Sequence, residues 1–364
     1  MTTTISTADG EKVMEDKAYI EAAALLQILE ISLKRGTYSS SHELATKTLQ
    51  LIEKYVQSTS WRNAEEVLRW LKNTSERLTN AAISESASSN MIHRLIKIIQ
   101  EEFAAKKKIE NSASSNLPAH APSRLDSTEL GIVDFTEEVP DLRSDILNAI
   151  LDLSAELESS GENIAEDAEK HIHQQDVILT VGKSRTVEKF LVKAKAKKRR
   201  FEVIVATCGP FYTGREMAAQ LKNRYKIPVT LMEDTGVFSV MSRVSKVIIG
   251  THTILANGGL KAIAGCHPIL LAAKHYNVPV LVLAPIYKLS PDYPSSNNVK
   301  IANRFVSPEN LVKYEDLQVM NNAHVYATVF DYVPPELITL FIFNIGSHSP
   351  SYIYRLLHDT YPQQ

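Results

Sequence analysis

The sequence predicts an α/β protein, with an N-terminal helical bundle domain followed by a domain built on a doubly wound, mostly parallel sheet. Over the first 110 residues, apolar side chains recur at the three- and four-residue spacing of a helix. After about residue 175, short runs rich in valine and isoleucine alternate with helical stretches, the order that produces a parallel sheet. The length of 364 residues suits two domains, because a typical domain holds roughly 150 residues.

The predicted N-terminal helical domain covers residues 1–110. In its first helix Ile20, Ala24, Ile28 and Ile31 recur at helical spacing, and Gly36 follows two basic residues as a stop signal. Further helices are expected near residues 40–55, 61–71 and 91–99.

Residues 111–140 predict a flexible acidic linker or insertion, because serine, alanine, proline and asparagine dominate its first half. Residues 141–170 are periodic again and predict a connecting helix. From Asp126 to Glu169 the chain carries fourteen acidic residues and one basic residue, Arg143. Such a run usually forms a solvated helix face, and the alternative is a docking surface for a basic partner.

Residues 171–364 predict a Rossmann-like α/β domain, in which a ligand would bind at the carboxyl ends of the parallel strands. Strands are expected at 177–181, 201–206, 229–232, 247–249 and 278–284. Helices are expected at 184–198, 214–225, 237–241 and 260–276.

Turns at these strand ends form a candidate anion pocket. Glycine permits a tight turn there, and a serine or threonine cap leaves backbone N–H groups of the following helix available to a phosphate. The candidate residues are Gly182, Ser184, Arg185, Thr186, Asp234, Asn257 and Gly258. The glycine fingerprints of dinucleotide sites and P-loops are absent, so the alternative is a set of capped turns without a ligand, with Asp234 as a helix N-cap.

Two further features suggest chemistry but have simpler explanations. The basic run from Lys193 to Arg200 ends a helix, where positive charge stabilises the helix dipole, and it lacks the aromatic residues that stack on bases. Cys208 follows a strand end, yet no histidine or acid stands beside it in the sequence to activate a thiolate. We therefore expect a solvated helix end and a buried cysteine.

The composition excludes several classes of protein. Forty basic and 42 acidic residues give a formal net charge of −2, so general attraction to nucleic acid or to a membrane surface is not expected. Two cysteines cannot form a disulfide framework, and no metal-binding spacing occurs, so we expect neither a metal nor a cofactor. The first ten residues lack the apolar core of a signal peptide, which favours a cytoplasmic protein.

A short apolar segment after the third strand is a candidate subunit interface. Val237, Phe238, Val240 and Met241 are followed closely by Arg243. Methionine and arginine are enriched at interfaces, so the segment suits a seam between subunits. The alternative is that these side chains fill the core beneath the sheet.

Several segments together resemble the regulatory subunits of eukaryotic translation initiation factor 2B, and the C-terminal ones resemble its beta-type members most. The segments are Leu179–Glu188, Val203–Ala206 with Cys208 and Pro210, Met241–Thr251, Thr253–Gly259, Phe330–Thr339 and Ser349–Arg355. The resemblance is specific over roughly residues 172–355 and holds only in outline for the helical N-terminal third.

This family shares its fold with sugar-phosphate isomerases, which use a cysteine and an aspartate at two strand ends. Aligned with those enzymes, Gly182 stands at the cysteine position and His252 at the aspartate position. The resemblance therefore implies a non-catalytic protein, because neither residue replaces the acid and base that proton transfer needs. The alternative is an isomerase similar to the methylthioribose-1-phosphate enzymes.

The resemblance also implies partners. They are the alpha, gamma, delta and epsilon subunits of the guanine-nucleotide exchange factor, of which epsilon carries the exchange activity. They include GDP-bound translation initiation factor 2, also with its alpha subunit phosphorylated. The expected role is to hold that factor and to make exchange sensitive to the phosphorylation, without direct contact with nucleic acid or a membrane.

Overall fold

The computed structural model describes residues 7–38, 40–58, 61–114, 135–137, 141–209, 211–294, 303–313, 315 and 323–362. The chain forms two compact units, which are described separately below. The first comprises Met1–Glu158 with His358–Gln364, and the second comprises Ser159–Leu357.

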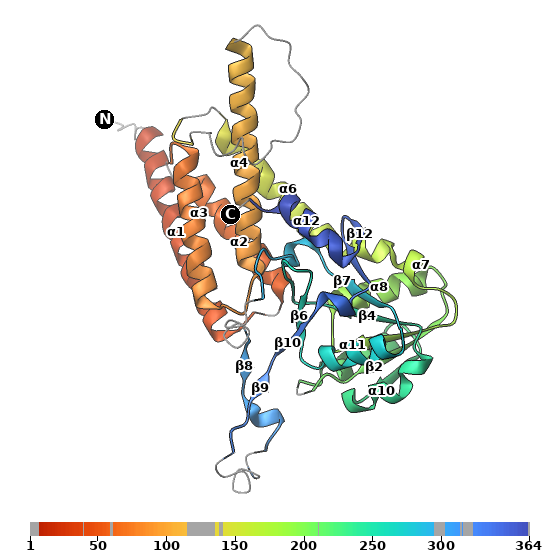
Figure 1. The fold of residues 1–364 in the computed structure, drawn as a ribbon. Helices are drawn as coiled ribbons and strands as arrows, with labels where there is room; N and C mark the ends of the chain where they lie inside the picture. The colour runs from red at the N-terminus through yellow and green to blue at the C-terminus, as the bar shows by residue number, and fades with distance from the viewer. Residues whose placement is uncertain are drawn as a thin grey trace. The chain divides into compact units, whose positions relative to one another are not determined.

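The first unit is built from long helices, as the sequence predicted. They are α1 (Thr7–Arg35), α2 (Ser41–Ser58), α3 (Ala64–Ala81), α4 (Ala87–Ser114) and the first part of α6 (Leu142–Glu166) (Figure 1). Helices α1 and α4 each pack against both α2 and α3. The core between them is apolar, and its fully buried side chains include Leu44, Leu51, Ile52, Leu71, Leu78, Ile92, Leu95 and Phe103.

Helix α1 ends where the sequence predicted. The Gly36 N–H bonds to the Leu33 carbonyl at 3.2 Å, and the Thr37 N–H bonds to the Ser32 carbonyl at 3.1 Å. These bonds satisfy the last carbonyl groups of the helix, and they require a left-handed residue after Arg35. Gly36 has φ +64°, which a glycine adopts without steric cost.

The packed face of α1 is not the one marked by Ile20, Ala24, Ile28 and Ile31. That stripe is exposed, and the helix instead buries a second apolar stripe. The buried stripe consists of Ala22, Leu26, Leu29 and Leu33. Both stripes have helical spacing, so periodicity alone identified the helix without identifying the face that packs.

Most of the predicted linker at 111–140 lies outside the described residues. Residues 111–114 form the end of α4, and 135–137 are described as a turn, whereas 115–134 and 138–140 lie outside. The flexible acidic linker therefore stays a prediction.

The second unit contains a seven-stranded sheet with the order β12-β11-β7-β4-β1-β2-β3. All neighbouring strands are parallel except β11 and β12. The strands are β1 (Asp176–Val181), β2 (Phe201–Ala206), β3 (Val229–Met232), β4 (Lys246–Gly250), β7 (Val280–Leu283), β11 (Leu340–Phe343) and β12 (Gly346–His348). The predicted α/β class, with a mostly parallel sheet after helices, is confirmed.

The order of the strands creates a switch point between β1 and β4. From β1 the chain builds outward through β2 to β3, then returns to β4 and builds the other way through β7 and β11. In such sheets the connections leave the strand ends in opposite directions at the switch, which opens a crevice beyond the carboxyl ends.

Helices cover the sheet, because its strands are apolar on both faces. Besides the end of α6, the helices described in this unit are α7 (Ala168–His171), α8 (Arg185–Ala196), α9 (Thr213–Asn223), α10 (Val237–Val240), α11 (Cys266–His275) and the first part of α12 (Ile353–Thr360), whose last residues belong to the first unit. Short 3-10 helices occur at η1 (Asp234–Gly236), η2 (Met241–Arg243), η3 (Ile286–Lys288), η4 (Pro308–Asn310), η6 (Pro335–Leu337) and η7 (Pro350–Tyr352). One core joins α7, α8 and α9 to the sheet through residues such as Phe190, Leu191, Met217, Leu221 and Val205.

The helix predicted at 260–276 begins later than expected. Residues Leu260–Ile263 form strand β6, and only Cys266–His275 are helical, as α11. Strand β6 lies in a separate three-stranded sheet, antiparallel to β10 (Phe330–Val333) and to β5 (Thr253–Ile254). A further pair joins β8 (Phe305–Val306) and β9 (Ala327–Thr328).

Helix α6 supplies residues to the cores of both units. Its Ile146, Ile150, Leu153 and Leu157 are buried before the division between Glu158 and Ser159, and Ile164 belongs to the core under the sheet. The division between the two units therefore falls inside the connecting helix predicted at 141–170. An uninterrupted helix gives no sequence signal for such a boundary.

Candidate functional site

The candidate site lies at the carboxyl ends of β1 and β2, beside the switch point of the sheet. Gly182 follows β1 directly and has φ +60°. A Cβ at this position would lie 3.0 Å from Thr213 Oγ1 and 3.3 Å from Cys208 Sγ. Glycine is thus needed here both for the backbone angle and for the close approach of the β2 loop.

The turn after Gly182 is capped as predicted. Ser184 is the N-cap of α8, and its Oγ accepts the Val187 N–H at 3.4 Å. Arg185 is exposed and Thr186 is half-buried in the first turn of the helix. Four of the candidate residues therefore adjoin one another at this helix start.

Asp234 does not cap the helix that follows it. Its carboxylate accepts the backbone N–H groups of Cys208 and Gly209, each at 2.8 Å, and lies 3.4 Å from the Thr207 hydroxyl. Asp234 therefore holds the turn after β2 from the neighbouring loop after β3. The predicted N-cap role is wrong because these long-range donors, 25–27 residues away, occupy the carboxylate instead.

Cys208 is a buried residue in a strained turn, and its environment disfavours a nucleophile. It has φ +61° although it is not glycine, and its Sγ donates to the Ala264 carbonyl at 3.4 Å. Burial, reinforced by the negative charge of Asp234, raises the pKa of its thiol to about 12. Burial likewise raises the pKa of Cys266 well above its usual value. Both thiols are therefore protonated at neutral pH.

His252, which the resemblance places at the isomerase aspartate position, is held by its neighbours. Its Nδ1 lies 3.0 Å from Thr253 Oγ1, and its ring packs edge-on against Phe330 with 4.5 Å between centroids. Its backbone N–H bonds to the Lys261 carbonyl at 3.1 Å. These contacts fix the ring against the second sheet.

The turn at Asn257 and Gly258 is positioned by the second sheet and not by the Gly182 turn. Asn257 Oδ1 accepts the Gly259 N–H at 2.9 Å, and its Nδ2 donates to the Tyr332 hydroxyl at 2.8 Å. A Cβ on Gly258 would face Pro335 and Pro350. The structure thus gives no contact that joins these two residues to the rest of the candidate pocket.

The candidate interface segment divides into buried and exposed residues. Val237 and Met241 are buried, Val240 is half-buried and Arg243 is exposed. The Phe238 side chain is 51% exposed. Its ring lies 5.4 Å from the His275 ring and 5.2 Å from the Tyr276 ring, centroid to centroid, so an aromatic group stands at the surface.

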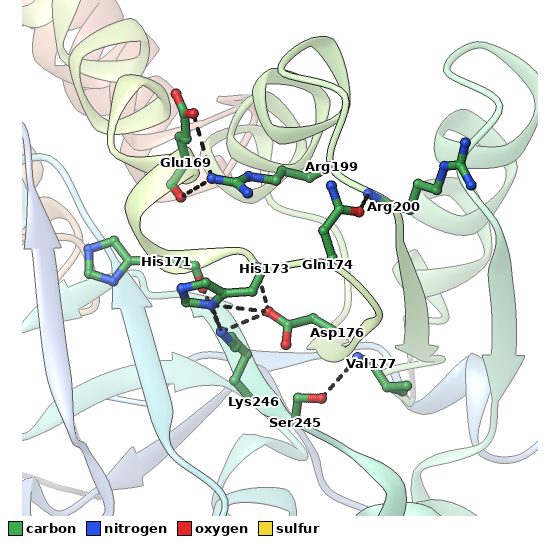
Figure 2. Close-up of polar contacts among 10 residues, drawn as sticks. All are labelled: Glu169, His171, His173, Gln174, Asp176, Val177, Arg199, Arg200, Ser245 and Lys246. Atoms are coloured by element: carbon green, nitrogen blue, oxygen red, sulfur yellow. Dashed lines mark hydrogen bonds and ion pairs between the residues drawn. The ribbon is translucent and has the colours of Figure 1, made fainter.

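The basic run at the end of α8 is paired with an acidic residue of α7. Glu169 contacts Arg199 at 3.5 Å (Figure 2) and Lys197 at 3.8 Å. Earlier in α8, Lys189 pairs with Glu162 of α6 at 2.9 Å. The lysine lowers the pKa of Glu162 through its hydrogen bond and its charge. The end of α8, which the sequence predicts to be solvated, therefore also forms ion pairs with Glu169.

The first part of α6 forms an open acidic groove with α4 in the first unit. The groove encloses about 350 Å³, and its carboxylates are Glu102, Asp145, Asp152 and Glu156. Arg94 pairs with Glu156 at 2.7 Å, and Lys106 pairs with Asp145. Of the acidic stretch, residues 126–134 and 138–140 lie outside the described residues.

A polar cluster at the amino ends of β1 and β4 escaped sequence reasoning. Figure 2 shows Lys246, whose Nζ donates to the His171 carbonyl at 2.6 Å and to the Asp176 carboxylate at 2.8 Å. Asp176 also accepts the His173 backbone N–H at 2.8 Å. Burial pushes the pKa of Asp176 up, but the hydrogen bonds outweigh it and hold the pKa below its usual value. No local spacing signals this cluster, because Lys246 lies seventy residues after Asp176 in the chain.

Two general findings concern metal ions and membranes. Within the described ranges, no group of three or more His, Cys, Asp or Glu side chains could hold a metal ion. None of the helices in the described part of the chain is both long enough and apolar enough to cross a bilayer.

Comparison with known proteins gives consistent matches along the chain. Residues 26–350 match the Initiation factor 2 subunit family. The chain is 37% identical over 386 positions to the translation initiation factor eIF2B subunit beta of Dictyostelium discoideum, which covers 96% of this chain and 98% of that relative. It is 30% identical over 387 positions to the subunit of the same name from Schizosaccharomyces pombe, covering 95% and 97%.

The fold of the chain is also similar to that of a solved structure that carries the eIF2B name. The crystal structure of the tetrameric eIF2B-beta2-delta2 complex from C. thermophilum contains a chain that superposes with a TM-score of 0.70. That chain is 26% identical, and the match covers 98% of this chain and 100% of that one. Both curated relatives carry the beta-type name that the C-terminal motifs predicted.

Proposed function

Because this chain belongs to the Initiation factor 2 subunit family, we propose that it is a non-catalytic regulatory subunit of the exchange factor for translation initiation factor 2. The observation that carries the proposal is similarity along almost the whole length to beta subunits, with 96% of this chain and 98% of one relative aligned. A protein that shared only the scaffold with isomerases would not match one subunit type from end to end.

The strand-end site supports a non-catalytic role. Gly182 has no functional group, and its neighbour Cys208 carries a protonated thiol at neutral pH. His252 is packed against Phe330. General acid–base catalysis needs an acid and a base positioned as a pair, and Gly182 and the protonated Cys208 do not supply that pair.

The partners follow from the same assignment. The chain joins the alpha, gamma, delta and epsilon subunits, and the complex holds GDP-bound initiation factor 2 and responds to phosphorylation of that factor's alpha subunit.

Co-expression of the tagged chain with the other four subunits tests whether it belongs to this complex. We expect all five chains to co-purify, and we expect nucleotide exchange by the complex lacking this chain to lose its sensitivity to the phosphorylated factor. A stable homomer that turns over methylthioribose-1-phosphate would instead establish the isomerase alternative.

We propose that the exposed part of the segment after β3 belongs to a seam with a delta-type subunit. Phe238, with His275 and Tyr276, provides an aromatic surface, whereas Val237 and Met241 anchor the segment in the core. Aromatic residues often carry much of the binding energy at interfaces.

Matched charge substitutions test the seam. Phe238→Glu should leave a soluble chain with normal circular dichroism that no longer co-purifies with the delta subunit. Leu311→Glu, a control at an equally exposed residue (51%), should still co-purify. Met241→Glu should be insoluble, since burying an unpaired charge costs roughly 3–5 kcal/mol. Normal assembly of Phe238→Glu would place the seam elsewhere.

We propose that an anion binds at the start of α8, with fewer residues than the seven of the candidate anion pocket. The start of α8, with Ser184, Arg185 and Thr186 after the Gly182 turn, presents backbone N–H groups and one positive side chain. Titration with inorganic phosphate should show binding that Arg185→Ala weakens and that Lys195→Ala, at the other end of the helix, leaves unchanged. Equal binding by both variants would count against the site.

A further inference from the structure

Helix α1 carries an apolar face that no described part of the chain covers. The outer stripe consists of Ile20, Ala24, Leu25, Ile28 and Ile31. Its isoleucines are exposed by 66%, 57% and 49% in chain order. The opposite face is already buried in the helical bundle, so these side chains are not needed for the fold of the first unit. A surface helix normally presents one apolar face and one polar face.

The neighbouring helices make the contrast clear. The outer faces of α2 and α3 carry polar pairs one turn apart, such as Lys47 with Glu43 at 2.6 Å and Arg69 with Glu65 at 2.8 Å. The outer stripe of α1 has aliphatic side chains at the equivalent spacing over about three turns. Contiguous exposed apolar surface of this kind marks an interaction site in a soluble protein.

Two charged residues lie on the same side of α1 as the outer stripe. Glu21 and Arg35 are both exposed on α1, and Ile28 lies midway between them, seven residues from each. Among the described residues neither forms an ion pair, whereas Glu30 on the inner side of the helix is engaged by Arg77 at 2.8 Å. The outer stripe therefore has one negative side chain near its start and one positive side chain just beyond its end.

This arrangement is complementary to itself when the helix is reversed. In an antiparallel pair of α1 helices related by a two-fold axis at Ile28, Glu21 of one copy faces Arg35 of the other. Leu25 then faces Ile31, and Ala24 faces Ser32. A parallel pair would bring like charges together at both ends.

We infer that the outer stripe of α1 is a self-association surface that binds a second copy of this chain as an antiparallel helix pair. The interface is isologous, so each residue of one stripe contacts its counterpart across the axis. One helix pair buries less surface than an interface of standard size, so the dimer is weak, with a dissociation constant in the micromolar range. This surface lies on the first unit and is independent of the Phe238 seam on the second.

Sedimentation of the full chain at increasing concentration tests the inference, with the seam variant Phe238→Glu as the background so that only other contacts are measured. We expect a monomer–dimer equilibrium that Ile28→Glu weakens roughly a hundredfold or more, since two carboxylates would meet on the axis. Ile83→Glu changes a comparably exposed isoleucine (54%) of the same unit, outside the stripe, and should leave the equilibrium unchanged. Equal sedimentation of the Ile28 and Ile83 variants, or a monomer throughout, would overturn the inference.

A charge exchange tests the antiparallel register. Glu21→Arg and Arg35→Glu should each weaken the dimer, and the double variant should restore it. In Ile28→Cys, a thiol crosslinker should join two copies of the chain, because residue 28 lies on the axis and the native cysteines are buried. Crosslinking of residue 28 to another protein instead of a second copy, or failure of the double variant to recover, would contradict the proposed pair.

Discussion

The carboxylate of Asp234 accepts the backbone N–H of Cys208 at 2.8 Å, although the two residues belong to loops after different strands. The bond is made to a residue with φ +61°, a backbone angle that costs a non-glycine residue roughly 1–2 kcal/mol. A second bond to Gly209 fixes the same turn. Asp234 thus stabilises the strained backbone that lies against Gly182.

Replacing Asp234 by asparagine should loosen this turn. The amide offers one acceptor oxygen in place of two and carries no charge, so one N–H loses its partner. We expect Asp234→Asn to lower the free energy of unfolding by about 1–3 kcal/mol. Urea unfolding measures this loss, and the adjacent exposed substitution Glu233→Gln should change stability by less than about 0.5 kcal/mol. An equal effect of both would show that the two bonds contribute little.

The buried thiol of Cys208 should make the protein sensitive to alkali. Its pKa rises from an ordinary 9.0 to about 12 on folding, so the folded state keeps a proton that the unfolded state loses between these values. The free energy of unfolding should therefore be independent of this group below pH 9 and fall as the pH rises toward 12. Cys208→Ala should decline less steeply than the wild type between pH 8 and 10.5.

Thiol labelling provides a second measurement of the same prediction. At pH 8 both cysteines of the native protein should react slowly with a disulfide reagent and react fully after unfolding in urea. Rapid labelling of native Cys208 would contradict the protonated, buried state.

Removing Lys246 should leave a nearly buried carboxylate without its cation. Lys246 and Asp176 are only 12% and 13% exposed. We expect Lys246→Met to destabilise the protein by roughly 3–5 kcal/mol. Lys183→Met breaks the more exposed pair with Glu216, and it should cost less than about 1 kcal/mol.

The same pair predicts a dependence on acid. The pKa of Asp176 is lowered on folding, so its contribution is present above the ordinary value of 3.8 and is lost as the pH falls through the folded value. Wild-type stability should decline in this acidic range, and Lys246→Met should decline less. Parallel acid profiles for the two proteins would show that another group is responsible.

Restoring a cysteine at Gly182 should not create an isomerase. A side chain there adopts φ +60° and meets Thr213 and Cys208, so we expect Gly182→Cys to cost at least roughly 1–2 kcal/mol. Gly182→Cys combined with His252→Asp should not turn over methylthioribose-1-phosphate. The matched control is Gly182→Ala with His252→Asp, which has the same backbone strain without the thiol. Turnover by the cysteine variant alone would mean that the scaffold retains the rest of an active site.

Local sequence patterns predicted individual helices and strands better than they predicted which strands pair with one another. The strands at 177–181, 201–206 and 229–232 and the cap at Ser184 depend on residues close in the sequence, and the structure contains them. The local pattern extends the helix prediction back to residues 260–263. Their partner strand, 330–333, lies about seventy residues later in the chain. Pairing with that strand decides their conformation, and no local window contains it.

The same limit applied to the candidate site. The sequence placed Gly182 and Ser184 correctly beside a helix start, since both belong to one turn. It grouped Asn257 and Gly258 with them because all follow strands, whereas their contacts are with Tyr332 and the 3-10 helices near 335 and 350. Asp234 directly precedes a helix in the sequence, so the local pattern favours a cap. The N–H groups that it accepts, those of Cys208 and Gly209, lie more than twenty residues away, and no local pattern contains them.

The helical unit at the beginning of the chain contains residues from near its other end. Lys97 donates to the His358 carbonyl at 2.6 Å, across 261 positions, and Tyr361 is buried. N-terminal domains usually fold first during synthesis, as they leave the ribosome. Here the first unit stays incomplete until residues 358–361 have emerged, after the entire α/β unit has been translated. A ribosome stalled before that point would hold a helical bundle whose contacts with residues 358–361 have not yet formed.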